Sequence, residues 1–274
     1  MDVPSVCLLA NLPLLAVGAV IHDISALRWL RRSVAVLCCV GLAVYAGRAN
    51  QPEWCLTAAA LLDQLVSTMP QIRNLFPAGR IVSPVAVLSL VAAYLVGGDL
   101  RTTAGLTVGR VDGWPLAWAT LCCLLSAAAL VSWSVFWVRG DHGPIQDTLG
   151  HMLTWSNFIA FAAFNAVREE IEFRMLLMGG LLVSGGTHQA AISSPKWLCA
   201  VVLLQAAYFA ACHVAGGFPS GRAGGALVFV WGTFLGTLRV WTGGMGLVLC
   251  LHFQADVVIF VLLLIEGRRQ QKEI

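Results

Sequence analysis

The chain has 274 residues, of which 58% are hydrophobic and only 11% are charged, and its mean hydropathy is +0.80. A soluble globular domain carries about 25% charged residues, so this composition excludes both a soluble protein and a disordered chain. The net charge of +3 is too small to indicate a nucleic-acid partner. The nine cysteines are odd in number and include no CxxC pair, so neither a disulfide framework nor a zinc ribbon is expected.

Long continuous apolar runs predict an all-α fold, a polytopic transmembrane helical bundle, because the strands of a membrane barrel would alternate over about ten residues. Eight runs are expected to cross the membrane; they cover residues 5–21, 33–47, 82–98, 114–138, 152–183, 197–216, 224–241 and 246–265. A ninth candidate, 54–69, is short and carries Asp63, so it either crosses or lies in the interface. The run 152–183 is too long for one crossing and is expected to tilt or to break at Gly179-Gly180.

The positions of arginine and lysine choose between eight and nine spans, because these residues concentrate in cytoplasmic loops. With nine spans, ten basic residues that include Arg139, Arg222 and Arg268 share the cytoplasmic side. Only four, including Arg110 and Lys196, then fall outside. We therefore predict nine spans and an outside N-terminus, in the endoplasmic reticulum of a eukaryote or the plasma membrane of a prokaryote.

Ionisable residues inside the later apolar runs are the main functional signal. They are Arg168, Glu169, Glu170, Glu172, Arg174, His213, His252 and Asp256. A charge at the centre of a membrane helix costs about 2.5–3.5 kcal/mol, so such residues usually face one another or water. Taken singly, each could be structural, as an ion pair between Glu170 and Arg174 or as histidines bound to backbone carbonyls. Together they indicate a polar functional site built by the C-terminal half, with Glu172 expected at its rim or snorkelling.

Three motifs contain most of these residues. EEIEFR at 169–174 reads as EExxxR, FAACH at 209–213 as FxxxH, and HFQAD at 252–256 as HxxxN with aspartate in the last place. In this order they resemble the CPBP family of intramembrane proteases, which includes the type II CAAX prenyl endopeptidases and bacterial relatives linked to bacteriocin maturation or immunity. The stretch WGTFLGTLRVWTGGMGLVLCLH is similar to the family's glycine-spaced helix, short turn and histidine-bearing helix.

The resemblance covers roughly 157–260 and implies three regions: N-terminal transmembrane helices of unassigned role at 1–150, a catalytic membrane core at 151–266 and a short basic tail at 267–274. It implies an endopeptidase that cuts a prenylated or other membrane-bound protein within the lipid bilayer, for example at the C-terminal tripeptide of a prenylated CAAX protein. Glu169 and His213 would activate water, and His252 and Asp256 would lie on the oxyanion side. Glu170 and Arg174 would support and orient these four residues.

The departure from the family pattern is Asp256, because an ionised aspartate cannot donate a hydrogen bond and would repel an oxyanion. Asp256 could instead be protonated by burial, could orient His252, or could bind a metal; loss of activity is a fourth alternative. Glu169, His213, His252 and Asp256 would make a credible Zn²⁺ set. The family has been described both as metalloproteases and as glutamate proteases. We expect the glutamate type, without a cofactor.

Two other classes of function compete with the protease. A proton-coupled transporter could use the same acids and histidines as a proton relay, but carriers often show internal repeats, and none is evident here. A catalytically inactive family member could serve as a membrane scaffold, which the change at Asp256 keeps open. The hydrolase patterns HExxH, GxSxG and GxGD are absent from the sequence. Gly232 and Gly236 form a GxxxG pattern that predicts close helix packing.

Overall fold

A computed structural model describes residues 91, 95, 102–136, 154–155, 157–184, 194–216, 218–219 and 221–272. Within this part of the chain every regular element is a helix. The helices are α7 (Gly113–Phe136), α9 (Phe158–Glu170), the π-helix η2 (Ile171–Leu177), α10 (Met178–Ser184), α12 (Pro195–Gly216), α13 (Gly221–Thr242) and α14 (Gly246–Lys272). The all-helical prediction is therefore confirmed for the described residues.

Four of these helices are long and apolar enough to cross a membrane: α7, α12, α13 and α14. They coincide with the predicted spans 114–138, 197–216, 224–241 and 246–265. The predicted spans 5–21, 33–47 and 54–69, and almost all of 82–98, lie outside the described residues. The number of eight or nine spans therefore stays a prediction.

The long run 152–183 is irregular, but at a different place from the one predicted. α9 passes into the π-helix η2, and regular α-helix resumes at Met178. The predicted break at Gly179-Gly180 is wrong, because both glycines lie inside α10. Gly179 serves a close approach instead, since a Cβ atom there would stand 3.1 Å from the carbonyl oxygen of Thr103. π-Turns within α-helices are frequent at functional sites, and η2 follows directly after Glu169 and Glu170.

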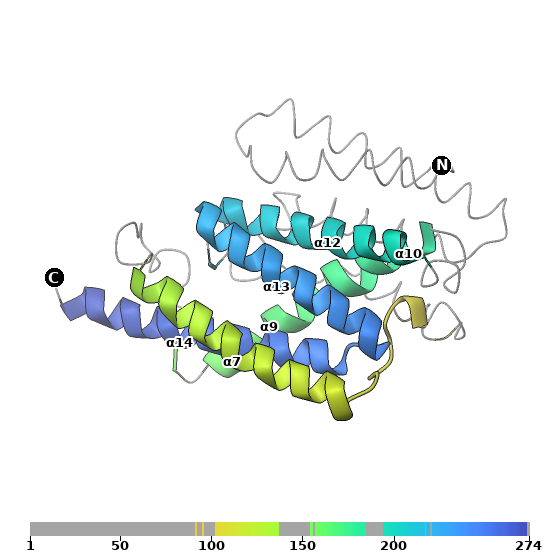
Figure 1. The fold of residues 1–274 in the computed structure, drawn as a ribbon. Coiled ribbons are helices and arrows are strands. Elements are labelled where there is room, and N and C mark those ends of the chain that lie inside the picture. The colour runs from red at the N-terminus through yellow and green to blue at the C-terminus, as the bar shows by residue number, and fades with distance from the viewer. Residues whose placement is uncertain are drawn as a thin grey trace.

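Figure 1 shows α12 and α13 lying side by side, with α14 between α7 and α9. The GxxxG pattern of α13 faces α12: a Cβ atom on Gly232 would lie 3.2 Å from the ring of Phe209. A Cβ atom on Gly236 would lie 2.6 Å from Nε2 of Gln205, a side chain that donates to the Gly232 carbonyl at 2.7 Å. The predicted packing role of this pattern is confirmed.

The segment before α7, residues 102–112, lies against the turn between α13 and α14, and we call it the 102–112 strap. Three backbone hydrogen bonds of 2.8–2.9 Å join the two, from Met245 to Thr107, from Gly246 to Val108 and from Arg110 to Thr242. The buried side chain of Arg239 on α13 donates to the carbonyl of Thr103. The strap thus ties the chain ahead of α7 to two helices of the C-terminal half.

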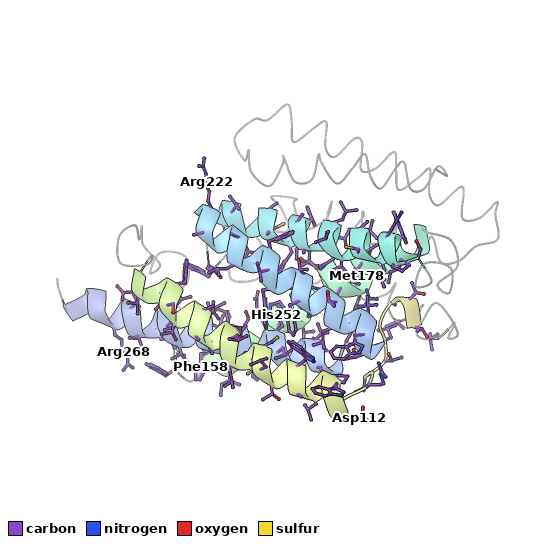
Figure 2. All side chains as sticks on the ribbon, viewed as in Figure 1. Asp112, Phe158, Met178, Arg222, His252 and Arg268 are labelled. Atoms are coloured by element: carbon purple, nitrogen blue, oxygen red, sulfur yellow. The ribbon has the colours of Figure 1, made fainter. Side chains whose placement is uncertain are left out.

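The polar ends of the bundle are visible in Figure 2, where Arg222 and Arg268 lie toward one end of the helices and Asp112 lies at the other. The predicted placing of Arg222 and Arg268 on the cytoplasmic side stays a prediction. His252 lies between the two ends, in the middle of the described helices.

Candidate active site

The structure buries all six residues that the sequence proposed as catalytic. They come from α9 and η2, from α12 and from α14, and their exposed fractions are 6% for Glu169, 0% for Glu170, 0% for Arg174, 9% for His213, 3% for His252 and 5% for Asp256. Charged groups tolerate such burial only when they are paired. The pairing among them therefore determines what the site can do.

Glu170 links the first motif to the third. Its Oε1 accepts a hydrogen bond from Nη1 of Arg174 at 2.8 Å, and the same oxygen lies 2.5 Å from Nδ1 of His252. A carboxylate bound by arginine is an acceptor, so Nδ1 of His252 carries the hydrogen of this contact. Glu170 thereby fixes both the orientation of the imidazole ring and which nitrogen remains for chemistry, namely Nε2.

Nε2 of His252 faces two further carboxylates. Oε2 of Glu169 lies 3.4 Å from it, and Oδ1 of Asp256 lies 3.8 Å from it. If Nε2 carried no hydrogen, three acceptor atoms would converge on one point and repel one another. The arrangement therefore favours a proton on Nε2, which makes His252 an imidazolium that donates from both nitrogens.

His213 and His252 share an aromatic neighbour, Phe209. The ring of Phe209 packs edge-on against His213 with a centroid distance of 4.6 Å and against His252 with one of 6.0 Å. Nδ1 of His213 lies 3.0 Å from the carbonyl oxygen of Phe209, one turn earlier in α12. A carbonyl can only accept, so Nδ1 holds the hydrogen and Nε2 is the nitrogen that can take up a proton. The FxxxH motif thus sets the tautomer of its own histidine.

Sequence reasoning missed part of the site. Nη2 of Arg168 donates to Oε1 of Glu169 at 2.6 Å and to Oδ1 of Asn165 at 2.8 Å, and Nδ2 of Asn165 donates to Oδ2 of Asp256 at 3.0 Å. The prediction of Glu172 at the rim is wrong, because Glu172 is 4% exposed and pairs with Arg168 at 3.4 Å. The spacing of 165, 168, 169 and 172 places these four residues on one helix face, which is the signal that would have found them.

Each carboxylate of the cluster therefore has a partner inside the protein. Glu169 and Glu172 bind Arg168, Glu170 binds Arg174 and His252, and Asp256 binds Asn165. Two guanidinium groups and an imidazole face four carboxylates. These pairings, together with the amide of Asn165, allow the acids to lie buried among apolar helices.

The four proposed Zn²⁺ ligands are not arranged around a common point in this structure. Among the described residues, no group of three or more histidine, cysteine, aspartate or glutamate side chains is arranged to hold one. Arg168 and Arg174 bind oxygens of Glu169 and Glu170 that would otherwise be available as ligands. The Zn²⁺ set of Glu169, His213, His252 and Asp256 therefore stays a prediction, and no step proposed below depends on it.

Comparison with known proteins gives one match. Residues 151–258 match the family model described as type II CAAX prenyl endopeptidase Rce1-like. The matched range contains all three motifs, and the match is consistent with the CPBP family that they resemble. No curated protein and no solved structure matches the chain. Residues 151–258 are thus similar to a family of membrane proteases, and the four long apolar helices fit an integral membrane protein.

Proposed function

We propose that this Rce1-like protein is an intramembrane endopeptidase that hydrolyses a peptide bond of a membrane-associated protein. The first substrate to test is a prenylated CAAX sequence, from which hydrolysis would release the C-terminal tripeptide. One observation carries the proposal. Within a region that matches the Rce1-like family, Glu169 and Glu170 of the first motif lie beside His252 of the third, and Phe209 of the second motif packs against both His252 and His213.

Glu169 and His213 are the proposed pair that activates water. Arg168 holds Oε1 of Glu169, so Oε2 is the oxygen presented toward the centre of the cluster. The pair of Glu169 and His213 takes one proton from water, and the water oxygen forms a bond to the carbonyl carbon of the substrate. The carbonyl oxygen becomes an oxyanion. The same proton then passes to the amine nitrogen as the C–N bond breaks, which leaves a carboxylic acid and an amine.

His252 is the proposed donor to the oxyanion. Three carboxylate oxygens at 2.5, 3.4 and 3.8 Å from its ring nitrogens stabilise the imidazolium form. A preset donor of this kind contributes about 2.7–4 kcal/mol to stabilisation of the transition state. In this scheme Asp256 acts through His252 as a negative charge, which removes the difficulty that an ionised aspartate cannot itself donate to an oxyanion.

The remaining parts of the proposal follow from the same assignment. Residues 151–266 would form the catalytic core, and residues 1–150 would supply further transmembrane helices of unassigned role. The compartment would be the endoplasmic reticulum of a eukaryote or the plasma membrane of a prokaryote. Glu170 and Arg174 would act as positioning residues, because they hold the His252 ring by its Nδ1.

The test is cleavage by the full chain purified in detergent. A farnesylated CAAX peptide and its unprenylated counterpart are incubated with the protein, with and without a chelator, and release of the tripeptide is measured. We expect release from the farnesylated peptide, unaffected by the chelator and lost in Glu169→Gln. Glu266→Gln, a carboxylate change on α14 outside the cluster, is the matched control and should cleave normally. A folded wild-type protein that cleaves neither peptide would favour the scaffold instead.

A further inference from the structure

Asn165 is an uncharged polar side chain that lies between Arg168 and Asp256, and its orientation can be determined. Its Oδ1 lies 2.8 Å from Nη2 of Arg168, and its Nδ2 lies 3.0 Å from Oδ2 of Asp256. The oxygen and nitrogen of an amide are easily exchanged when they are assigned. Here the assignment is fixed, because a guanidinium can only donate and the atom facing it must be the amide oxygen. Asn165 therefore donates to Asp256.

This donation determines how the Asp256 carboxylate stands. With Oδ2 occupied by Asn165, Oδ1 is the oxygen that faces Nε2 of His252, at 3.8 Å. Arg168 acts on Glu169 in the same way, since it holds Oε1 at 2.6 Å while Oε2 faces the same Nε2 at 3.4 Å. Hydrogen bonds thus connect Asp256 to Glu169 through Asn165 and Arg168. The carboxylates at the two ends of this series both face Nε2 of His252.

We propose that Asn165 is a positioning residue, which together with Arg168 forms an amide–guanidinium bridge between Glu169 and Asp256. The bridge holds one oxygen of each acid so that the other faces Nε2 of His252. The family pattern HxxxN has an amide at the position of Asp256. In this chain Asn165 of α9 supplies an amide beside Asp256 instead. The inference rests on the proposed function, because the groups it positions are those of the proposed reaction.

A merely structural asparagine would account for the hydrogen bonds without any role in the reaction, so the two roles must make different predictions. The chain offers a swap that separates them. Asn165→Asp alone replaces the amide at position 165 by a carboxylate about 3 Å from the carboxylate of Asp256. Two like charges this close are unfavourable in a buried site. In the Asp256→Asn background, the same change restores a donor and an acceptor with their direction reversed, and Arg168 can still donate to the new carboxylate.

The experiment measures kcat, KM and the thermal unfolding midpoint in detergent for the wild type, Asn165→Asp, Asp256→Asn and the double variant, with the farnesylated peptide. We expect Asn165→Asp to lower kcat by about tenfold or more in the wild type, with KM little changed. In the Asp256→Asn background, the same change should lower kcat by less than about twofold. Asn157→Asp, at the N-terminal end of α9 outside the cluster, is the matched control and should leave kcat unchanged.

Equal effects of Asn165→Asp in the two backgrounds, on kcat and on the midpoint alike, would overturn the inference, because the side chains at 165 and 256 would then act independently. A shift in the midpoint alone, with kcat additive at temperatures below unfolding, would make Asn165 structural and overturn its positioning role. Failure of the proposed function looks different: the wild type and all variants would cleave nothing, whatever the midpoints show.

Discussion

Breaking the ion pair between Glu170 and Arg174 from one side should strongly destabilise the protein, because the partner left behind is a buried charge. Glu170 and Arg174 are both 0% exposed, and one oxygen of Glu170 serves Arg174 and His252 together. Glu170→Gln keeps the shape of the side chain but removes its charge. Arg174 is then left as a buried cation without its carboxylate.

The magnitude follows from these contacts. A hydrogen bond to a charged group contributes about 1.5–3 kcal/mol, and Glu170 accepts two of them. The glutamine oxygen can still accept one, so the loss is one such bond plus the cost of an uncompensated buried charge. Breaking a buried pair from one side costs about 3–5 kcal/mol. At about 2–4 °C per kcal/mol, the unfolding midpoint should fall by about 6–20 °C.

The assay is thermal unfolding of the full chain in one detergent, with three variants. Arg174→Met should cost less than Glu170→Gln, because Glu170 keeps His252 as a partner and the methionine still packs on the ring of Phe209, where the guanidinium now lies 4.3 Å from the centroid. The double variant should be less destabilised than the sum of the two single ones, since it leaves no unpaired charge. A midpoint of Glu170→Gln equal to that of the wild type, or full additivity, would refute the buried ion pair.

Further predictions concern the reaction and the packing of the helices. Glu169→Gln and His213→Ala should each abolish cleavage in protein that is still folded at the assay temperature, and the double variant should be little less active than either single one. Asp256→Asn should lower kcat about tenfold, and a chelator should have no effect, because the change removes a charge that supports the imidazolium of His252. Preserved activity in this variant would instead make Asp256 a neutral donor. Inhibition of the wild type by chelators would make Asp256 a metal ligand. Gly236→Ala should lower the free energy of unfolding by about 1–3 kcal/mol in the same assay, because the new Cβ atom would displace the buried amide of Gln205. An unchanged midpoint would show that α12 and α13 can move apart at this position without loss of stability.

The site could be located from the sequence because the energetics of the membrane made it visible. A charge in an apolar run is costly, so Glu169, Glu170, His252 and their neighbours stood out against the hydrophobic background. The described spans were predictable because an uninterrupted apolar run of about 20 residues matches the thickness of the hydrocarbon core. Asn165 did not stand out, because it carries no charge and its role depends on where α14 places Asp256.

Other features could not be predicted because they depend on contacts between distant segments. Gly179 looked like a helix break, but it allows the chain at Thr103 to approach, and no local pattern shows which segment will lie there. Arg239 passed without notice within an apolar run, although its side chain holds the same segment. In each case the neighbour that accounts for the residue belongs to no motif.

The 102–112 strap has a consequence for how the protein can be dissected. The range that matches the protease family begins at 151, after both the strap and α7. A chain trimmed to that range would leave the amides of Met245 and Gly246 and the guanidinium of Arg239 without their present acceptors, at the turn that leads into the helix of His252. Boundaries for a minimal folded fragment should therefore be drawn before residue 102, not at the start of the range that matches the family model.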